Sequence, residues 1–174
     1  IRKAGLENEI HLNIEVNHAT LSGHNFEHEI SYAIANNALG SIDINRGDTL
    51  LGWDTDQFPN NPAELLMAFY YIYSNGGFKQ GGLNFDAKIR RQSTDPEDLF
   101  YAHIGGMDVA ARVLLAVEKM INDKEIPNYI QNRYKDWDAE LGKFIHNKDT
   151  NLESVAARVL DENLDPQPRS GNQE

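Results

Sequence analysis

The 174-residue chain contains no cysteine, so disulfides, thiolate metal sites and cysteine nucleophiles are excluded. It also has few basic residues. Its 16 lysines and arginines stand against 27 aspartates and glutamates, which gives a formal net charge of −11. A polyanion of this kind repels nucleic acid and anionic lipid, so we expect neither as a partner. The short basic cluster at residues 88–91 does not offset this charge.

Several other sequence signals are missing. No apolar run reaches the roughly 18 residues that a membrane span needs, and no signal peptide is recognisable. With the lack of cysteine, these observations favour a cytoplasmic protein. The nucleophile elbow, the phosphate-binding glycine loop and the dinucleotide-binding motif do not occur. The chain begins at Ile1 in a charged stretch, and we expect it to be the middle of something longer.

The apolar pattern alternates between strands and helices. It predicts strands at residues 10–16, 41–45 and 83–86, and helices at residues 24–38, 62–75 and 108–123. Glycine, proline, aspartate and asparagine are frequent between residues 46 and 61, which predicts a long loop there. Alternation of this kind indicates an α/β fold, in which parallel strands are joined by crossover helices.

The pattern changes at about residue 124, which divides the chain into two parts. Residues 1–123 hold three β/α units, and residues 124–174 form a helical arm with an extended tail. In the arm we expect a helix pair at residues 134–144. A capping box of Thr150 and Glu153 predicts a further helix to about Glu162. Three parallel strands leave open edges, so the segment either pairs with another chain or is part of a larger barrel.

Acidic residues stand at the ends of the predicted strands. Each strand is followed or ended by one, a histidine follows the first, and the long loop adds an Asp-x-Asp pair whose side chains would point the same way in extended backbone. The candidate metal ligands are Glu15, His18, Asp43, Asp54, Asp56 and Asp86. Active sites of α/β proteins form at the carboxyl ends of the strands, so we expect these side chains to converge.

The conjunction of these groups carries the prediction, because a single acid at a strand end is usually a turn residue or a helix cap. Six such groups in one place would repel each other, and a cation removes that repulsion. Acids with one imidazole favour an octahedral site for Mg²⁺, Mn²⁺ or Co²⁺ over calcium. The pattern therefore favours metal-assisted chemistry on a hydroxylated or phosphorylated small molecule.

The other histidines carry no site prediction. His24 and His28 lie beside Glu27 and Glu29, in a stretch that predicts a solvated helix face. His103 is expected in a loop at the entry of the helix at residues 108–123.

Four segments resemble xylose isomerase: residues 13–24 (NIEVNHATLSGH), 40–48 (GSIDINRGD), 52–59 (GWDTDQFP) and 81–88 (GGLNFDAK). The chain is most similar to the longer-chain class of that family, from about residue 10 to the final SGNQE, with the same order and spacing. The resemblance implies a TIM-barrel enzyme that interconverts an aldose and a ketose by a hydride shift with two divalent cations, Mg²⁺, Mn²⁺ or Co²⁺. This chain would supply the last three strands and helices of the (β/α)8 barrel and the C-terminal helical arm.

The resemblance also implies a role for each candidate ligand. Glu15 would bridge the two cations. The structural metal, which holds substrate hydroxyls, would be bound by Glu15, Asp43 and Asp86. The catalytic metal would be bound by Glu15, His18, Asp54 and Asp56. The side-chain ligands of the catalytic metal are then complete, and those of the structural metal lack one glutamate.

The catalytic residues of the family have no counterpart here. Its ring-opening histidine with an aspartate partner, its aromatic substrate wall and its catalytic lysine all lie upstream, so we assign no catalytic residue and expect this chain alone to be inactive. Three alternatives stay open. The chain is part of an aldose isomerase that acts on xylose, or a self-associating, metal-binding barrel fragment without catalysis, or part of a related isomerase that acts on another aldose. In each case we expect a homo-oligomer that completes the barrel.

Overall fold

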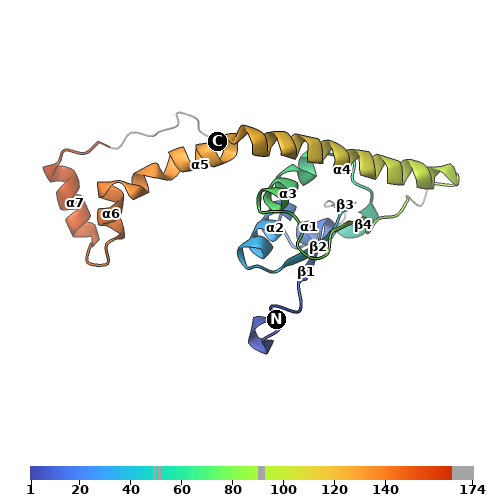
Figure 1. Ribbon diagram of the computed structural model, residues 1–174, viewed down its shortest axis with the longest axis horizontal. Coiled ribbons are helices and arrows are strands. Elements are labelled where there is room, and N and C mark those ends of the chain that lie inside the picture. Colours follow the sequence, from blue (N-terminus) through green and yellow to red (C-terminus); the bar gives the residue numbers. More distant parts are fainter. Residues whose placement is uncertain (49, 51, 90–92, 166–174) are drawn as a thin grey trace. The chain divides into compact units, whose positions relative to one another are not determined.

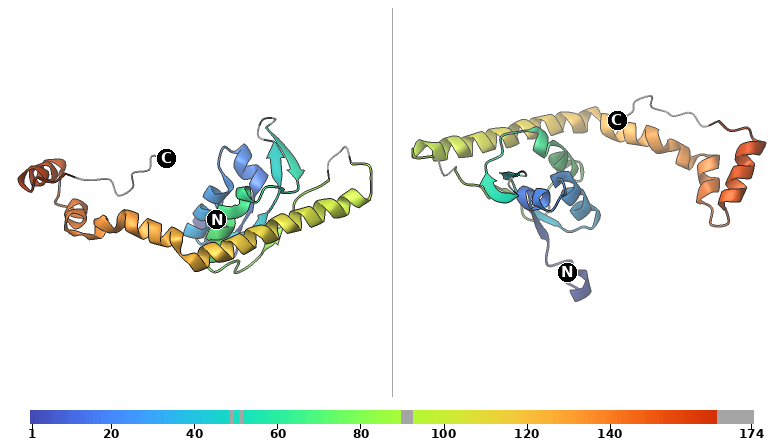
Figure 2. Two further views of the ribbon diagram at one scale, coloured as in Figure 1. Left: turned by 90° about the horizontal axis from the view of Figure 1, so that it is seen from above. Right: turned by 180° about the vertical axis from the view of Figure 1, so that it is seen from behind.

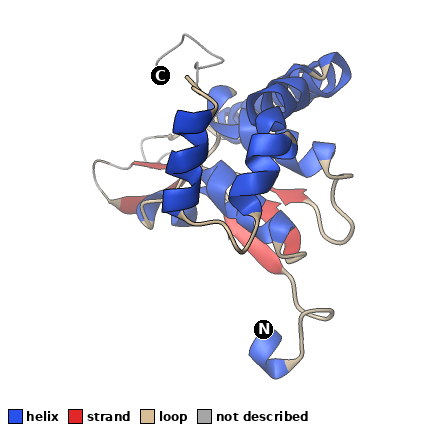
Figure 3. Ribbon diagram, turned by 90° about the vertical axis from the view of Figure 1, so that its left-hand side faces the viewer, coloured by secondary structure: helices blue, strands red, loops and turns tan. Residues whose placement is uncertain are grey.

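The computed structural model describes residues 1–48, 50, 52–89 and 93–165, and leaves out the side chains of Trp53 and Asp54. The chain divides into two compact units, Ile1–Asp123 and Lys124–Glu174. The described part is mixed α/β, mostly helical with a small parallel sheet (Figure 3). The predicted α/β class is confirmed at this level.

The first unit is built on a three-stranded parallel sheet. Its strands are β1 (Leu12–Glu15), β2 (Leu39–Asp43) and β5 (Leu83–Asn84), in the order β1-β2-β5. The register places Glu15 opposite Asp43, and Asp43 opposite Asn84. Because the strands run in parallel, their carboxyl ends meet at one end of the sheet. The three predicted strands are therefore confirmed, but β1 and β5 are shorter than predicted and β2 begins and ends two residues earlier.

The helices of this unit lie in layers against the sheet. After the short 3-10 helix η1 (Arg2–Ala4), they are α1 (Val16–Leu21), α2 (Phe26–Ala35), α3 (Ala63–Ser74) and α4 (Glu97–Asp123). Helix α2 packs on β1 and β2, α3 packs on α2, and α4 packs on α3 (Figure 1). The largest fully buried apolar side chains are those of Ile30, Ile42, Ile44, Leu65, Phe69, Ile72, Val113 and Val117.

The prediction of a long loop at residues 46–61 is wrong in part. This region contains an antiparallel hairpin of β3 (Arg46–Asp48) and β4 (Trp53–Gln57), which packs beside α1 (Figure 2). In its turn, Gly52 has a φ of 64° and its N–H donates to the Asp48 carbonyl at 3.0 Å. Glycine and aspartate are as typical of hairpin turns as of loops, so composition alone did not separate the two.

One helix was missed and one helix boundary differs from the sequence prediction. No helix was predicted where α1 lies, and its first residue, Val16, was placed in the first strand. Helix α4 begins at Glu97 rather than at residue 108, so His103 lies inside the helix and not in a loop before it. Pro96 precedes this start, a position that suits proline. The first turns of α4 expose several apolar side chains, so they lack the amphipathic stripe that signals a helix.

Helix α4 is long and apolar enough to cross a membrane by length and composition alone. Apolar runs did not reveal it, because Asp108 and Arg112 interrupt the sequence. One such helix is weak evidence for a membrane span, and 28% of its apolar stretch is buried. Val109, Val113 and Val117 of α4 are among the buried positions of the first unit.

The second unit contains α5 (Glu125–Tyr134), the 3-10 helix η2 (Lys135–Asp138), α6 (Glu140–His146) and α7 (Leu152–Asp161). The helix pair predicted at residues 134–144 corresponds to η2 and α6, and the prediction missed α5. The helix expected to about Glu162 is present as α7, but its capping box was misplaced by one residue. Asn151 and Ser154 form it, in place of Thr150 and Glu153.

Candidate metal centre

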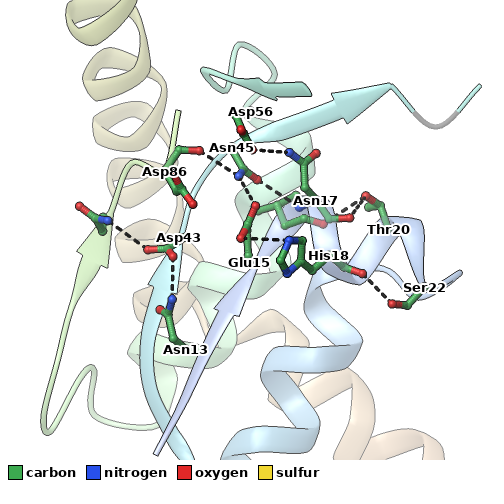
Figure 4. A network of polar contacts seen from close by, with 12 residues as sticks. Asn13, Glu15, Asn17, His18, Thr20, Ser22, Asp43, Asn45, Asp56 and Asp86 are labelled. Carbon is green, nitrogen blue, oxygen red and sulfur yellow. Dashed lines mark hydrogen bonds and ion pairs between the residues drawn. The ribbon is translucent and has the colours of Figure 1, made fainter. Parts of the chain in front are cut away.

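Three of the predicted ligands meet at the carboxyl end of the sheet. Glu15 and Asp43 are the last residues of β1 and β2, and Asp86 follows β5 by two residues. One carboxylate oxygen of each lies within 4.8 Å of the corresponding oxygens of the other two (Figure 4). The parallel register of the sheet explains this convergence.

Two asparagines hold the Asp43 carboxylate between its neighbours. Asn13 Nδ2 on β1 donates to Asp43 Oδ2 at 2.6 Å, and Asn84 Nδ2 on β5 donates to Asp43 Oδ1 at 3.2 Å. Each oxygen of the central carboxylate therefore has a donor from a different flanking strand. This arrangement fixes the orientation of Asp43 within the cluster.

Asn45 connects the three exits of the sheet. Its side chain is 1% exposed, and its Nδ2 donates to Glu15 Oε1 at 2.6 Å and to the Asp86 carbonyl at 3.0 Å. Its Oδ1 accepts from the backbone N–H of Asn17, at 3.1 Å, in the first turn of α1. One buried amide thus links the ends of β1 and β2, the start of α1 and the segment after β5 (Figure 4).

His18 approaches the cluster through Glu15. It lies in α1, three residues after Glu15, and its Nε2 is 3.5 Å from Glu15 Oε2. The two oxygens of Glu15 therefore face different partners, Asn45 on one side and His18 on the other. The Glu15 side chain is 10% exposed and that of His18 is 68% exposed, so the histidine stands on the open side of the site.

The two aspartates that the sequence placed on a loop lie in β4, and the side chain of only one of them is described. Asp56 Oδ1 lies 3.5 Å from Asn17 Nδ2, and Asp56 Oδ2 lies 2.6 Å from Lys88 Nζ. Its φ is 43°, so the extended backbone that was expected to align Asp54 with Asp56 does not hold at this residue. The side chain of Asp54 lies outside the described residues.

The donor set fits a hard divalent cation. Three carboxylates whose oxygens come within 4.8 Å of one another repel, and a cation among them would remove that repulsion. Carboxylate oxygens with one imidazole at the rim match the ligands that Mg²⁺ and Mn²⁺ prefer. Asn13, Asn45 and Asn84 would orient these ligands from outside the coordination sphere.

Sequence reasoning did not assign the asparagines or Lys88. Asn45 follows Asp43 by two residues, and a polar residue after a buried apolar strand was the available signal. The amide of Asn45 carries no charge, however, and its position in the sequence did not distinguish it from an ordinary turn residue.

The chain is similar to known proteins over its whole length. A family model described as the XylA2 C-terminal domain matches residues 130–174. Over all 174 residues, the chain is 56% identical to a protein named xylose isomerase from Histophilus somni, and 53% identical to proteins of the same name from Chelativorans sp. and Haemophilus influenzae. The resemblance to xylose isomerase is confirmed.

The match covers the whole of this chain and part of each relative. The chain spans 40% of the length of the three xylose isomerases. The family model at residues 130–174 is consistent with a C-terminal part of such a protein. The candidate metal centre lies in the first unit, upstream of the residues that the family model matches.

Proposed function

We propose that this chain supplies part of the two-metal centre of a xylose isomerase, which interconverts D-xylose and D-xylulose. The observation that carries the proposal is the cluster of Glu15, Asp43 and Asp86 at the ends of adjacent parallel strands. The identity of 56% to a protein named xylose isomerase supports it. On this proposal, β1, β2 and β5 are the last three strands of a TIM barrel, and residues 124–174 are its helical arm.

The proposal gives the candidate ligands distinct tasks. Asp43 and Asp86 would hold one cation together with Glu15, and Glu15, His18, Asp54 and Asp56 would hold the second. When bound, the cations polarise the sugar carbonyl and lower the pKa of a bound water or hydroxyl. The protein side chains would hold the cations, and the hydrogen bond from Asn45 orients the Glu15 carboxylate. Asp56 pairs with Lys88, so a cation would compete with the ammonium for this carboxylate.

We assign no catalytic residue to this chain, and we propose that it has no isomerase activity by itself. A chimaera tests the whole proposal. The segment of the Histophilus somni xylose isomerase that matches this chain is replaced by it, and conversion of xylose to xylulose is measured with Mg²⁺, Mn²⁺ or Co²⁺. We expect an active enzyme that loses its activity on Glu15→Gln.

The matched control is Glu9→Gln, an exposed glutamate outside the cluster, which should leave activity unchanged. A folded chimaera that stays inactive with every metal would contradict the proposal. A panel of other aldoses, tested in the same chimaera, separates xylose from another sugar substrate. Higher kcat/KM for a different aldose would favour the related-isomerase alternative.

A second candidate is a self-associating metal-binding fragment without catalysis. Strands β1 and β5 lie at the edges of the sheet, and an edge strand is a template for pairing with another chain. Helix α4 also exposes large apolar side chains, namely Leu99, Phe100, Tyr101, Ile104, Met107 and Leu115. Light scattering tests this candidate, since a monomer at micromolar concentration would contradict self-association.

A further inference from the structure

A second group of metal-binding side chains stands at the start of α2, apart from the strand ends. His24, His28 and Glu29 each offer one ligand atom, and these atoms all lie within 4.8 Å of one another. His24 Nδ1 is hydrogen-bonded to Glu29 Oε1, and His28 Nδ1 lies 3.6 Å from the same oxygen. The two imidazole rings are in contact, with centroids 4.7 Å apart. The sequence predicted only a solvated helix face here.

The local backbone brings these three side chains together. Gly23 has a φ of 82°, and the N–H of His24 donates to the Ala19 carbonyl at 3.0 Å, which turns the chain between α1 and α2. Asn25 then caps α2 by accepting from the N–H of His28 at 2.9 Å. His24 therefore sits just before the helix, and His28 and Glu29 lie in its first turns.

A further contact orients His28. Its ring stacks on that of Tyr32, one helical turn later, with centroids 6.5 Å apart and 17° between the ring planes. The imidazoles of His24 and His28 are about half exposed and Glu29 is less so. Solvent reaches both rings, so a metal ion has an entry path and water can complete its coordination.

The chemistry of this trio differs from that of the strand-end cluster. Two imidazoles and one carboxylate are ligands for Zn²⁺, Co²⁺ or Ni²⁺, whereas Mg²⁺ prefers carboxylate and water oxygens. Catalytic zinc sites usually have three protein ligands and leave the fourth position to water or substrate. We propose that His24, His28 and Glu29 form a surface site for a transition metal such as Zn²⁺, separate from the strand-end carboxylates.

The test uses the full chain and titrates Zn²⁺ by calorimetry, with Co²⁺ absorption as a second readout. Excess Mg²⁺ and a Glu15→Gln/Asp43→Asn background remove binding at the strand ends. In that background we expect one equivalent of Zn²⁺ to bind. The double variant His24→Ala/His28→Ala should bind it about 100-fold more weakly or not at all, because losing a partner outside the coordination sphere alone costs about 10- to 100-fold.

His146→Ala is the matched control, since it removes an exposed histidine from the second unit and should leave Zn²⁺ binding unchanged. Circular dichroism checks that each variant keeps its helix content. Two results would overturn the proposal. One is equal Zn²⁺ affinity of the Glu15→Gln/Asp43→Asn protein with and without His24→Ala/His28→Ala. The other is no Zn²⁺ binding to the Glu15→Gln/Asp43→Asn protein that keeps both histidines. In either case the trio is a hydrogen-bonded surface group only. Because Glu15 and Asp43 are already substituted, neither result depends on the isomerase proposal.

Discussion

Asn45 Nδ2 lies 2.6 Å from Glu15 Oε1, and this contact joins the end of β1 to the residues that follow β2. The same nitrogen reaches the Asp86 carbonyl at 3.0 Å. Asn45 is buried and uncharged, so it can stand among carboxylates without adding to their repulsion. It brings donors to the two outer strand ends, to the Glu15 carboxylate after β1 and to the Asp86 carbonyl after β5.

Asn45→Ala should weaken both the fold and the metal centre. It removes the donor to Glu15 and the hydrogen bond that Asn45 Oδ1 accepts from the buried N–H of Asn17, which costs about 1–3 kcal/mol in the free energy of unfolding. Losing an orienting partner should also lower Mn²⁺ affinity about 10- to 100-fold. Urea unfolding and Mn²⁺ calorimetry measure the two effects. Asn60→Ala, at an exposed asparagine, is the control, and equal results for both variants would refute a positioning role for Asn45.

Asp86→Asn separates metal binding from folding. Asp86 is exposed, and the substitution removes one negative charge from the cluster, so the metal-free protein should be about as stable as the parent. At Mn²⁺ equal to 100 times the parent Kd, the cation should stabilise the parent by about 2.7 kcal/mol. A variant with 100-fold weaker binding would gain only about 0.4 kcal/mol at the same concentration.

Denaturant unfolding with and without Mn²⁺ measures this difference, and Asp108→Asn on α4 serves as a charge-matched control. An equal Mn²⁺-dependent gain in Asp86→Asn and the parent would mean that Asp86 is no ligand. A large loss of stability in the metal-free variant would show instead that Asp86 has a structural role.

The convergence of Glu15, Asp43 and Asp86 was predictable because it follows from one rule of parallel sheets. Each acid ends or follows a β-rich segment, and parallel strands place their carboxyl ends together. The asparagines that orient these acids were not predictable in the same way. Asn45 is recognised only when Asn17, Glu15 and the Asp86 carbonyl are seen around it, and those residues are distant in sequence.

The missed elements have local causes. The hairpin of β3 and β4 depends on the φ of 64° at Gly52, which the sequence permits but does not require. The first turns of α4 carry Leu99, Phe100 and Tyr101 in succession, and three adjacent apolar residues show no helical period. At α7, Thr150 and Asn151 are both good capping residues, and only the extended backbone of Asn151 decides between them.

Gly81→Ala should disrupt the pairing of β5 with β2. Gly81 has a φ of 80°, and a Cβ there would lie 2.6 Å from both the Gly40 carbonyl oxygen and Ser41 Oγ. Backbone strain of this kind costs about 1–3 kcal/mol, and the clash with backbone adds to it. Gly82→Ala is the matched control, because a Cβ there meets nothing within 4 Å and its φ is not in the left-handed region.

In chemical unfolding, the free energy of unfolding of Gly82→Ala should therefore be close to that of the parent, and that of Gly81→Ala should be clearly lower. Mn²⁺ affinity should fall in Gly81→Ala as well, because β5 leads directly to Asp86. Equal stability of the two variants would show that the pairing of β5 does not depend on this close approach.

Asn151→Ala should destabilise the first turn of α7. Asn151 Oδ1 accepts from the Ser154 N–H at 2.9 Å, and Ser154 Oγ accepts from the Asn151 N–H at 3.0 Å, so the substitution removes one of these two bonds and loosens the other. Loss of such a cap costs about 1 kcal/mol, which corresponds to about fivefold faster exchange of the Ser154 amide hydrogen. Hydrogen exchange followed by NMR measures this rate directly. Glu153→Ala keeps both bonds and should accelerate that amide less. The opposite ranking would return the cap to Thr150 and Glu153, where the sequence pattern placed it.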